Sequence, residues 1–319
     1  MNSSVEKYRR FCREDNDLPL FFQDWWLDAA AGEDNWDVQL VEEDGNIKAC
    51  IPYIIKTKAF LKSMGMPDYT PYLGAWIRNN PIGSSDEAIK NEQSILSQLL
   101  GKLPKFDKYH VKLSTEILSA DAFANLDFKK TDCYTYVLNN IQDHTNILNG
   151  FKPANRSKIK QAEGKIEIIE SNDLPALFNI CELSMKRQNL DIPYSYKRLE
   201  KIYKAAKAEN SVQILLAKDE EERIHAGALL VWDKKRAYYL MGGNDPELRK
   251  HGANTLLIWK AIKFCSEHVD TFDFEGSMIE SIEKFFKSFG AVRQSYYLVT
   301  KTSSKLIKTA QKVKSIIKR

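Results

Sequence analysis

The same succession of predicted elements occurs twice along this chain, and this repeat limits the fold more than any single motif does. Apolar and polar residues alternate over residues 36–42 and 47–55, on either side of Asp44-Gly45-Asn46, and an Asp-Gly pair in such a place predicts a β-hairpin. Residues 212–217 and 226–232 predict a second hairpin. After each hairpin, the pattern indicates a helix, a strand, a helix and a strand.

The later elements of the two halves correspond in pairs. The predicted pairs are the helices 85–100 and 253–265, the strands 109–113 and 272–275, the helices 120–126 and 282–286, and the strands 128–138 and 290–300. Any chain that alternates strands and helices shows part of such an order, but here order and spacing agree over five elements. We infer a diverged tandem duplication with a unit of roughly 150 residues. The expected fold is mixed α/β, with domains at residues 1–145 and 146–300 and a C-terminal segment at 301–319.

Composition places the chain among soluble globular proteins. Its 319 residues are 43% hydrophobic and 28% charged, and no apolar run approaches the roughly 20 residues that span a bilayer. The first residues lack the apolar core of a signal peptide, so we expect a cytoplasmic protein. The five cysteines lie far apart without metal-ligand spacing, which indicates reduced, buried thiols and predicts no metal site.

Basic residues concentrate at the C-terminal end. Residues 301–319 hold seven of the 47 Lys and Arg residues and no acidic residue, which leaves 40 basic against 43 acidic residues elsewhere. Leu306, Ala310, Val313 and Ile317 recur at helical spacing, with Lys305 and other lysines on the flanks. A basic amphipathic helix of this kind either lies on the inner face of an anionic membrane or packs on the protein body, and both alternatives stay open.

Five short strings of the sequence point to a known family. They are residues 21–26 (FFQDWW), 69–76 (YTPYLGAW), 155–162 (NRSKIKQA), 272–277 (FDFEGS) and 286–290 (FKSFG). Together and in this order, the chain resembles, over nearly its whole length, the tandem-domain FemAB-like and CelD-like branch of the GNAT acyltransferase superfamily. The first domain looks degenerate, because its match to the region of Lys287 has Asn125 and Asp127 and no lysine.

The resemblance implies that an acyl donor binds where two central parallel strands part, here residues 238–241 and 272–275. The implied phosphate contacts are Gly242, Gly243 and Asn244 after the first strand, and Arg249, Gly252 and Ala253 at the start of the next helix. The sequence departs from the family's loop at Asn254, where a small residue is usual. The implied donor is acyl-coenzyme A or an aminoacyl-tRNA. The lack of a long helical insertion favours the thioester, and tRNA bound by the basic segments is the alternative.

Three residues are candidates for the chemistry. Strand alternation places Asp273 and Glu275 on one face, where a carboxylate can accept the proton of an amine, unless both are surface charges at a strand end. Lys287 matches a family position that stabilises charge on the donor, and its alternative is an exposed helix lysine. The sequence has no nucleophile elbow and no Walker loop, so direct transfer is the simplest mechanism.

The acceptor is expected between the two domains, since clefts between domains commonly hold ligands. Tyr69, Tyr72 and Trp76 offer aromatic faces for a sugar, and Arg187 and Gln188 offer polar groups for a phosphate or carboxylate. The alternative for the aromatic residues is core packing.

The leading interpretation is an N-acyltransferase or aminoacyltransferase acting on an amine of a small-molecule or lipid-linked cell-envelope precursor. The alternative is a non-catalytic GNAT-like binding module in polysaccharide assembly.

Overall fold

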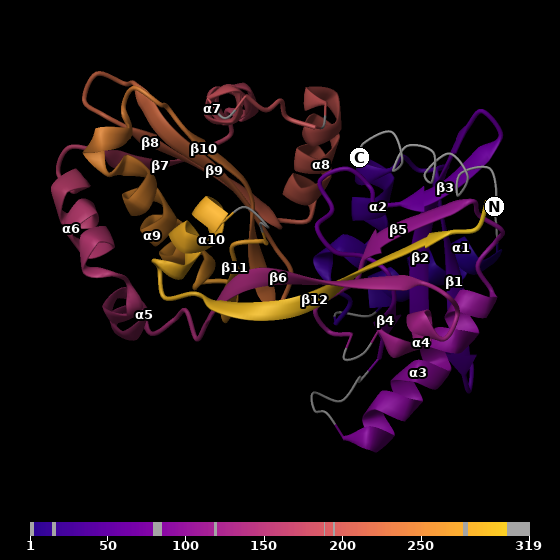
Figure 1. Ribbon diagram of the computed structural model, residues 1–319. Helices are drawn as coiled ribbons and strands as arrows, with labels where there is room; N and C mark the ends of the chain where they lie inside the picture. Colours follow the sequence, from indigo (N-terminus) through magenta and orange to yellow (C-terminus); the bar gives the residue numbers. More distant parts are fainter. Residues whose placement is uncertain are drawn as a thin grey trace, which may run out of the picture. The chain divides into compact units, whose positions relative to one another are not determined.

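The computed structural model describes residues 3–14, 17–78, 85–117, 120–187, 189–193, 195–276 and 280–304. The chain divides into two compact units (Figure 1). Residues up to Cys133, together with those from Ser295 on, form the first unit, and Tyr134–Gln294 form the second. The strands β6 (Lys129–Asn139) and β12 (Val292–Thr302) each begin in one unit and end in the other.

The first unit combines a mixed sheet with helices. Its other elements are α1 (Ser3–Glu14), η1 (Leu20–Phe22), α2 (Asp24–Ala30), β1 (Trp36–Glu43), β2 (Asn46–Lys58), β3 (Leu61–Gly65), β4 (Trp76–Ile77), α3 (Asp86–Gly101), β5 (Lys108–Lys112) and α4 (Asp121–Ala124). The strand order is β1-β2-β3-β5-β12, and β4 pairs with β2. One apolar core joins α1 and α3 to this sheet and includes Tyr8, Leu96 and Val111.

The local sequence explains how these elements begin and turn. The β1–β2 hairpin closes at Asp44 and Gly45, whose φ angles of 50° and 77° are the left-handed values that a tight hairpin turn requires. The helix α3 begins after Ser85, whose hydroxyl accepts a hydrogen bond from the backbone N–H of Ala88 at 3.2 Å.

The second unit also has one mixed sheet with helices. Its other elements are α5 (His144–Gly150), α6 (Pro153–Ala162), β7 (Glu167–Ser171), α7 (Leu174–Lys186), α8 (Tyr196–Ala208), β8 (Val212–Lys218), β9 (Ile224–Trp232), β10 (Arg236–Asn244), η2 (Arg249–His251), α9 (Ala253–Cys265), β11 (Thr271–Asp273) and α10 (Glu280–Lys287). The strand order is β6-β11-β10-β9-β8-β7. The helices α7 and α9 cover opposite faces of this sheet (Figure 1).

The two units share one strand plan. In the first, β1–β2 and β2–β3 are antiparallel, β3–β5 is parallel and β5–β12 is antiparallel. In the second, β8–β9 and β9–β10 are antiparallel, β10–β11 is parallel and β11–β6 is antiparallel. The inferred duplication therefore has the common strand order that it requires, and the mixed α/β fold is confirmed. The domain limits at residues 145 and 300 were expected from the sequence and stay a prediction.

The last strand of each plan comes from the other half of the sequence. The ladder that completes the first unit pairs Thr302 with Lys108 and Leu298 with Lys112. The ladder that completes the second unit pairs Asn139 with Thr271 and Val137 with Asp273. The strands β6 and β12 correspond along the sequence, and each pairs with strands of the unit formed by the other half of the chain.

One expectation about secondary structure was wrong, and one strand was missed. The strand β3 was not predicted, because Leu61-Lys62-Ser63-Met64-Gly65 shows no clear alternation and owes its pairing to β2 and β5. Gly242, Gly243 and Asn244 were expected in a loop, but they belong to β10 because β9 continues beside them up to Ala226. The expected helix over residues 305–319 lies outside the described residues. Within the described ranges, no helix has the length and apolar character to cross a membrane.

Candidate functional site

The parallel strands β10 and β11 part at the point expected for a donor site. Their ladder runs from the pair Arg236–Thr271 to the pair Tyr238–Asp273 and ends there, while β10 continues to Asn244. The register between β10 and β9 shifts between Tyr239 and Met241, which marks a β-bulge next to the end of the parallel ladder. Backbone groups of β10 beyond Tyr238 therefore face the side that β11 has left.

Gly243 has a packing reason to be glycine. A Cβ atom there would lie 2.6 Å from the backbone O of Ile180 and 2.7 Å from the Cα of Cys181, both in α7. At Gly242 a Cβ atom would meet the hydroxyl end of the Tyr239 side chain, at 1.7 Å. Gly243 thus lets α7 lie directly on the end of β10, whether or not a ligand approaches there.

The start of α9 has the features of an anion site. Gly252 is its N-cap with a φ of 73°, and no side chain caps this end of the helix. A Cβ atom on Gly252 would lie 2.7 Å from the backbone O of Lys158, so glycine also permits the close contact with α6. Arg249 is exposed and belongs to η2 immediately before α9. Free N–H groups and a basic side chain at a helix N-terminus favour a phosphate.

Polar atoms near this helix start are buried without a hydrogen-bond partner among the described residues. They are Oδ1 of Asn244, Oδ1 of Asn254 and Nδ1 of His225. His225 is 2% exposed, its Nε2 lies 2.8 Å from Oδ2 of Asp219, and its ring centroid lies 5.2 Å from that of His251. The hydrogen bond from His225 and those from Arg223 lower the pKa of Asp219. Sequence reasoning missed Asp219 and His225, since no motif connects two residues that meet only through the β8–β9 hairpin.

Asp273 is fully buried and held by several groups. Its Oδ1 accepts hydrogen bonds from the hydroxyl of Thr135 and from the backbone N–H of Glu275 at 2.8 Å. Its Oδ2 lies 3.0 Å from Nη1 of Arg236, and Nη2 of the same guanidinium donates to the side chain of Gln294 at 3.1 Å. Burial raises the pKa of Asp273, although Arg236 and Thr135 oppose this shift. With no exposed surface, the carboxylate is placed to fix its neighbours.

One of those neighbours is Glu275, which has an unusual backbone. Its φ is 58°, a left-handed value that non-glycine residues seldom adopt. The hydrogen bond from its N–H to Asp273 holds this turn. A Cβ atom on the next residue, Gly276, would lie 2.0 Å from the backbone O of Tyr134, so the chain needs glycine there. The segment directly after β11 is therefore tightly fixed, as a site for a positioned carboxylate requires.

Lys287 lies on the other face of the sheet. Asp273 pairs with Val137 and shares its face with Thr135, whereas Tyr136 and Phe274 point into the core that includes α9 and Phe286. The ammonium of Lys287 lies 5.6 Å from the ring centroid of Tyr136 and pairs with Glu283 one helical turn earlier. The structure joins the Glu275 backbone to Asp273 and does not bring Lys287 onto the face of Asp273.

The aromatic candidates for acceptor binding are buried in the first unit. Tyr69, Tyr72 and Trp76 are 6%, 4% and 5% exposed. The ring of Tyr72 contacts Phe21 and Tyr296, with centroids 6.3 and 5.0 Å away. These contacts belong to core packing. In the second unit, Arg187 is exposed at the C-terminal end of α7, and Gln188 lies outside the described residues.

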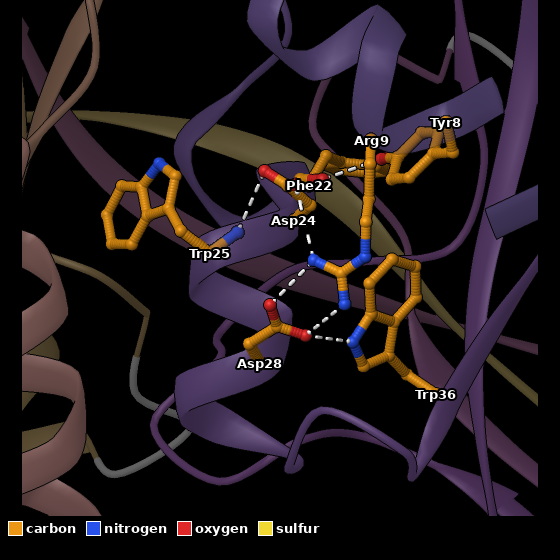
Figure 2. A network of polar contacts seen from close by, with 7 residues as sticks. All are labelled: Tyr8, Arg9, Phe22, Asp24, Trp25, Asp28 and Trp36. Atoms are coloured by element: carbon orange, nitrogen blue, oxygen red, sulfur yellow. Dashed lines mark hydrogen bonds and ion pairs between the residues drawn. The ribbon is translucent and has the colours of Figure 1, made fainter. Parts of the chain in front are cut away.

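The FFQDWW string forms a network in the first unit (Figure 2). Arg9 makes two hydrogen bonds to Asp28, at 2.7 and 2.8 Å, and lies 3.4 Å from Asp24. Trp36 donates to Asp28 at 2.8 Å, and the guanidinium lies 5.1 Å from the Trp36 ring centroid. Figure 2 shows Trp25 pointing away from Arg9. The network fastens α2 to α1 and β1.

The same string also reaches the Thr-Pro loop. The indole N–H of Trp26 donates to the hydroxyl of Thr70 at 3.0 Å. Burial raises the pKa of Asp24, against the effect of Arg9. Two strings that carried the resemblance are therefore joined by a buried hydrogen bond, which explains their occurrence together in structural terms.

No metal site is formed by the residues that the structure describes: they contain no group of three or more His, Cys, Asp or Glu side chains placed to hold an ion. All five cysteines are buried free thiols.

Comparisons with known proteins agree with this geometry. Residues 154–283 match the model of an acetyltransferase (GNAT) domain. None of the curated proteins matches the sequence. Among solved structures, FemX has a TM-score of 0.66 at 16% identity, with 93% of this chain and 96% of that chain covered.

Two further solved structures are similar over nearly their whole length. L-PGS from Bacillus licheniformis has a TM-score of 0.54 at 14% identity, with 98% and 97% of the two chains covered. The C-terminal domain of a candidate lysylphosphatidylglycerol synthetase from Agrobacterium fabrum has a TM-score of 0.53 at 12% identity, with 93% and 92% covered. At these identities the likeness concerns the fold. Residues 154–283 thus match a GNAT domain, and the fold of the chain is similar to that of FemX over nearly its whole length.

Proposed function

We propose that this protein transfers an acyl or aminoacyl group directly to an amine on a cell-envelope precursor. The observation that supports this most is the parting of β10 and β11 beside a β-bulge, within a segment that matches a GNAT domain. The uncapped start of α9, with Arg249 before it, supports binding of the donor's phosphates by Gly242, Gly243, Asn244, Arg249, Gly252 and Ala253. The acceptor class is proposed from the family resemblance and from the similar fold of a structure named as the C-terminal domain of a lysylphosphatidylglycerol synthetase.

The reaction assigns a different task to each candidate residue. The amine's lone pair forms the new C–N bond at the donor carbonyl, and the C–S bond of a thioester or the C–O bond of an ester breaks. Glu275 accepts the proton that the amine loses, and the leaving thiolate or alkoxide takes up a proton. Asp273 acts through Glu275, because it is buried and bonds the Glu275 backbone. Lys287 remains a proposed electrostatic stabiliser of charge on the donor, and its ammonium lies on the sheet face opposite to Asp273.

Either donor class fits these elements. A thioester such as acyl-coenzyme A presents phosphates to the start of α9, and an aminoacyl-tRNA presents its terminal phosphates to the same place. The proposed acceptor is a small-molecule or lipid-linked amine, with Arg187 and Gln188 as candidate contacts. Tyr69, Tyr72 and Trp76 are buried and pack in the core of the first unit.

Calorimetric titration with acyl-coenzyme A and, separately, with aminoacyl-tRNA tests the donor. We expect one of them to bind, and Arg249→Ala to weaken that binding by about tenfold or more, because a charge-assisted hydrogen bond is lost. Arg10→Ala, which removes an exposed arginine of the first unit, is the matched control and should bind as the native protein does. Binding without product formation would support the binding-module alternative, and binding of neither donor would refute the proposal.

Glu275→Gln tests the proton acceptor. Loss of the carboxylate should lower kcat by roughly 10²- to 10⁴-fold, the range for general base catalysis, with little change in donor affinity. Glu280→Gln is the control, because Glu280 is an exposed glutamate of α10 paired with Lys284. An unchanged kcat in Glu275→Gln would remove this residue from the mechanism.

A further inference from the structure

The hairpin between β2 and β3 ends in an exposed aromatic side chain. Phe60 is 97% exposed, and the pair Lys58–Leu61 closes the ladder around the two turn residues, Ala59 and Phe60. Figure 1 shows this hairpin as the β2–β3 turn of the first unit. A single exposed apolar side chain is common on protein surfaces, so the exposure of Phe60 alone decides nothing. Three other observations give it meaning.

The first observation is the backbone of the turn. Ala59 and Phe60 have φ angles of 47° and 67°, both left-handed. Two-residue hairpin turns with this geometry favour Asn-Gly or Asp-Gly, because bulky residues are disfavoured at positive φ. The other hairpin of this unit follows that preference with Asp44 and Gly45. Here the chain retains a large aromatic residue at a strained position, which points to a role for the side chain.

The second observation is the charge around the tip. Lys56, Lys58 and Lys62 lie within residues 56–62, and that range has no acidic residue. Lys56 pairs only loosely with Asp68, at 3.8 Å, and its side chain is 70% exposed. The register Lys56–Ser63–Lys108 places Lys108 of β5 on the same sheet face as Lys56 and Lys58. Basic side chains therefore surround the base of the aromatic tip.

The third observation is how far the hairpin projects. The strand β1 begins at Trp36, opposite Ile54, and on the other side of β2 and β3 the backbone N–H of Asp107 donates to the carbonyl of Lys62 at 2.8 Å. At about 3.3 Å per residue, the turn lies roughly 7 Å beyond the level of Asp107 and about 16 Å beyond the start of β1. Phe60 thus reaches out ahead of the neighbouring strands of its own unit.

We propose that the β2–β3 tip is an interfacial anchor for an anionic phospholipid bilayer. Phe60 enters the boundary between headgroups and acyl chains, while Lys56, Lys58 and Lys62 keep their ammonium groups among the lipid phosphates. A short hairpin with one aromatic ring and flexible lysines suits a fluid anionic lipid surface, because such a surface does not require a side chain of defined shape. The proposal concerns where the protein works, and it stands or falls independently of the transfer reaction.

Co-sedimentation of the full chain with lipid vesicles tests the proposal. We expect binding to vesicles of phosphatidylglycerol and phosphatidylcholine, weaker binding in high salt, and little binding to phosphatidylcholine alone. Phe60→Ser should lower the partition coefficient about tenfold, because the apolar anchor is lost. Leu126→Ser is the matched control, since Leu126 is another exposed apolar residue of this unit, at 38% exposure, and should change nothing. Equal partition of Phe60→Ser and the native chain would overturn the proposal.

A label at the tip gives a second, local readout. The five native cysteines are buried, so Phe60→Cys offers one exposed thiol for an environment-sensitive fluorophore. Its emission should shift to the blue with phosphatidylglycerol vesicles, and the same label on Leu126→Cys should not respond. A label that stays in water while the protein sediments with vesicles would assign the membrane contact to another segment, such as residues 305–319, and would refute the anchor. Failure of the native full chain to bind phosphatidylglycerol vesicles would also refute the proposal.

Discussion

Asp273 and Glu275 lie two residues apart, yet their surroundings differ sharply. Asp273 is buried among Thr135, Arg236 and the Glu275 backbone, whereas Glu275 sits in a left-handed turn that leads out of the strand. Strand alternation predicted that both residues lie on one face. The strand β11 ends at Asp273, so Glu275 lies beyond it and the shared face stays a prediction. The burial of Asp273 was not predictable from sequence, since β6 and β10 come from distant segments.

The buried carboxylate predicts a pH effect on stability. Burial raises the pKa of Asp273, so in the pH window between its ordinary value and the raised value the folded state binds the proton and the unfolded state releases it. Stability contributed by this group therefore falls as pH rises through that window. In Asp273→Asn this fall should disappear from urea unfolding curves recorded from about pH 3 to pH 7. Asp270→Asn, at an exposed site nearby, should keep the native slope; equal slopes for Asp273→Asn and the native chain would contradict the assignment.

Substitution of Lys287 tests whether its positive charge contributes to turnover independently of Asp273 and Glu275. Its ammonium pairs with Glu283, whose pKa is lowered mainly by that hydrogen bond and also by one from Tyr136. Lys287→Ala should stay folded and lower turnover by several-fold to a few hundred-fold, as when one stabilising charge is removed. Lys284→Ala removes an equivalent ion pair with Glu280 on α10 and serves as the control. Equal turnover in the two variants would show that Lys287 is an ordinary helix lysine.

At the scale of elements, hairpins, helices and their order were predictable, because they depend on local alternation, capping residues and turn residues. Ser85 and Asp173 cap α3 and α7 as their sequence positions suggest. The strand β3 and the end of β10 escaped prediction, because neighbouring strands supply their pairing. The bulge between Tyr239 and Met241 likewise has no signal in Tyr-Tyr-Leu-Met.

The contact between β10 and α7 predicts a strong effect of a single methyl group. Gly243→Ala would place Cβ within 3 Å of three backbone atoms of Ile180 and Cys181, which cannot yield as a side-chain end does. We expect a loss of about 1–3 kcal/mol in the free energy of unfolding, typical of overpacking. Gly101→Ala, with no heavy atom within 4 Å of the new Cβ, should change it by less than about 0.5 kcal/mol. Thermal or urea unfolding measures both, and similar values for the two would contradict the described contact.

At the scale of the whole molecule, the sequence predicted two related halves but not the exchange of β6 and β12. Each of these strands follows its own half along the chain, so a reading in sequence order assigns it there. Non-local pairing decides otherwise: the last residues of β12 pair with β5, and the last residues of β6 pair with β11.

Truncation distinguishes the exchanged strand from the tail beyond it. Ending the chain after residue 304 leaves all of β12 in place, so thermal stability should stay nearly unchanged. Ending it after residue 294 also removes the β12 residues that pair with β5, and should markedly destabilise the first unit. Calorimetry and limited proteolysis report both outcomes. Equal stability of the two truncated chains would mean that the first unit does not need its exchanged strand.

Because β12 is at the end of the chain, the exchange also means that β5 is synthesised long before the strand that pairs with it. The edge of β5 stays unpaired until residues 298–302 are made. Translation of the second unit in between takes roughly 10 to 30 s at 5–20 residues per second. During that interval an open strand edge is exposed in a crowded cell, and such edges recruit strands from other chains. Lys108, His110 and Lys112 alternate along β5. The positive charges of the two lysines and the polar ring of His110 make this edge a poor template for aggregation until the chain's own last strand emerges.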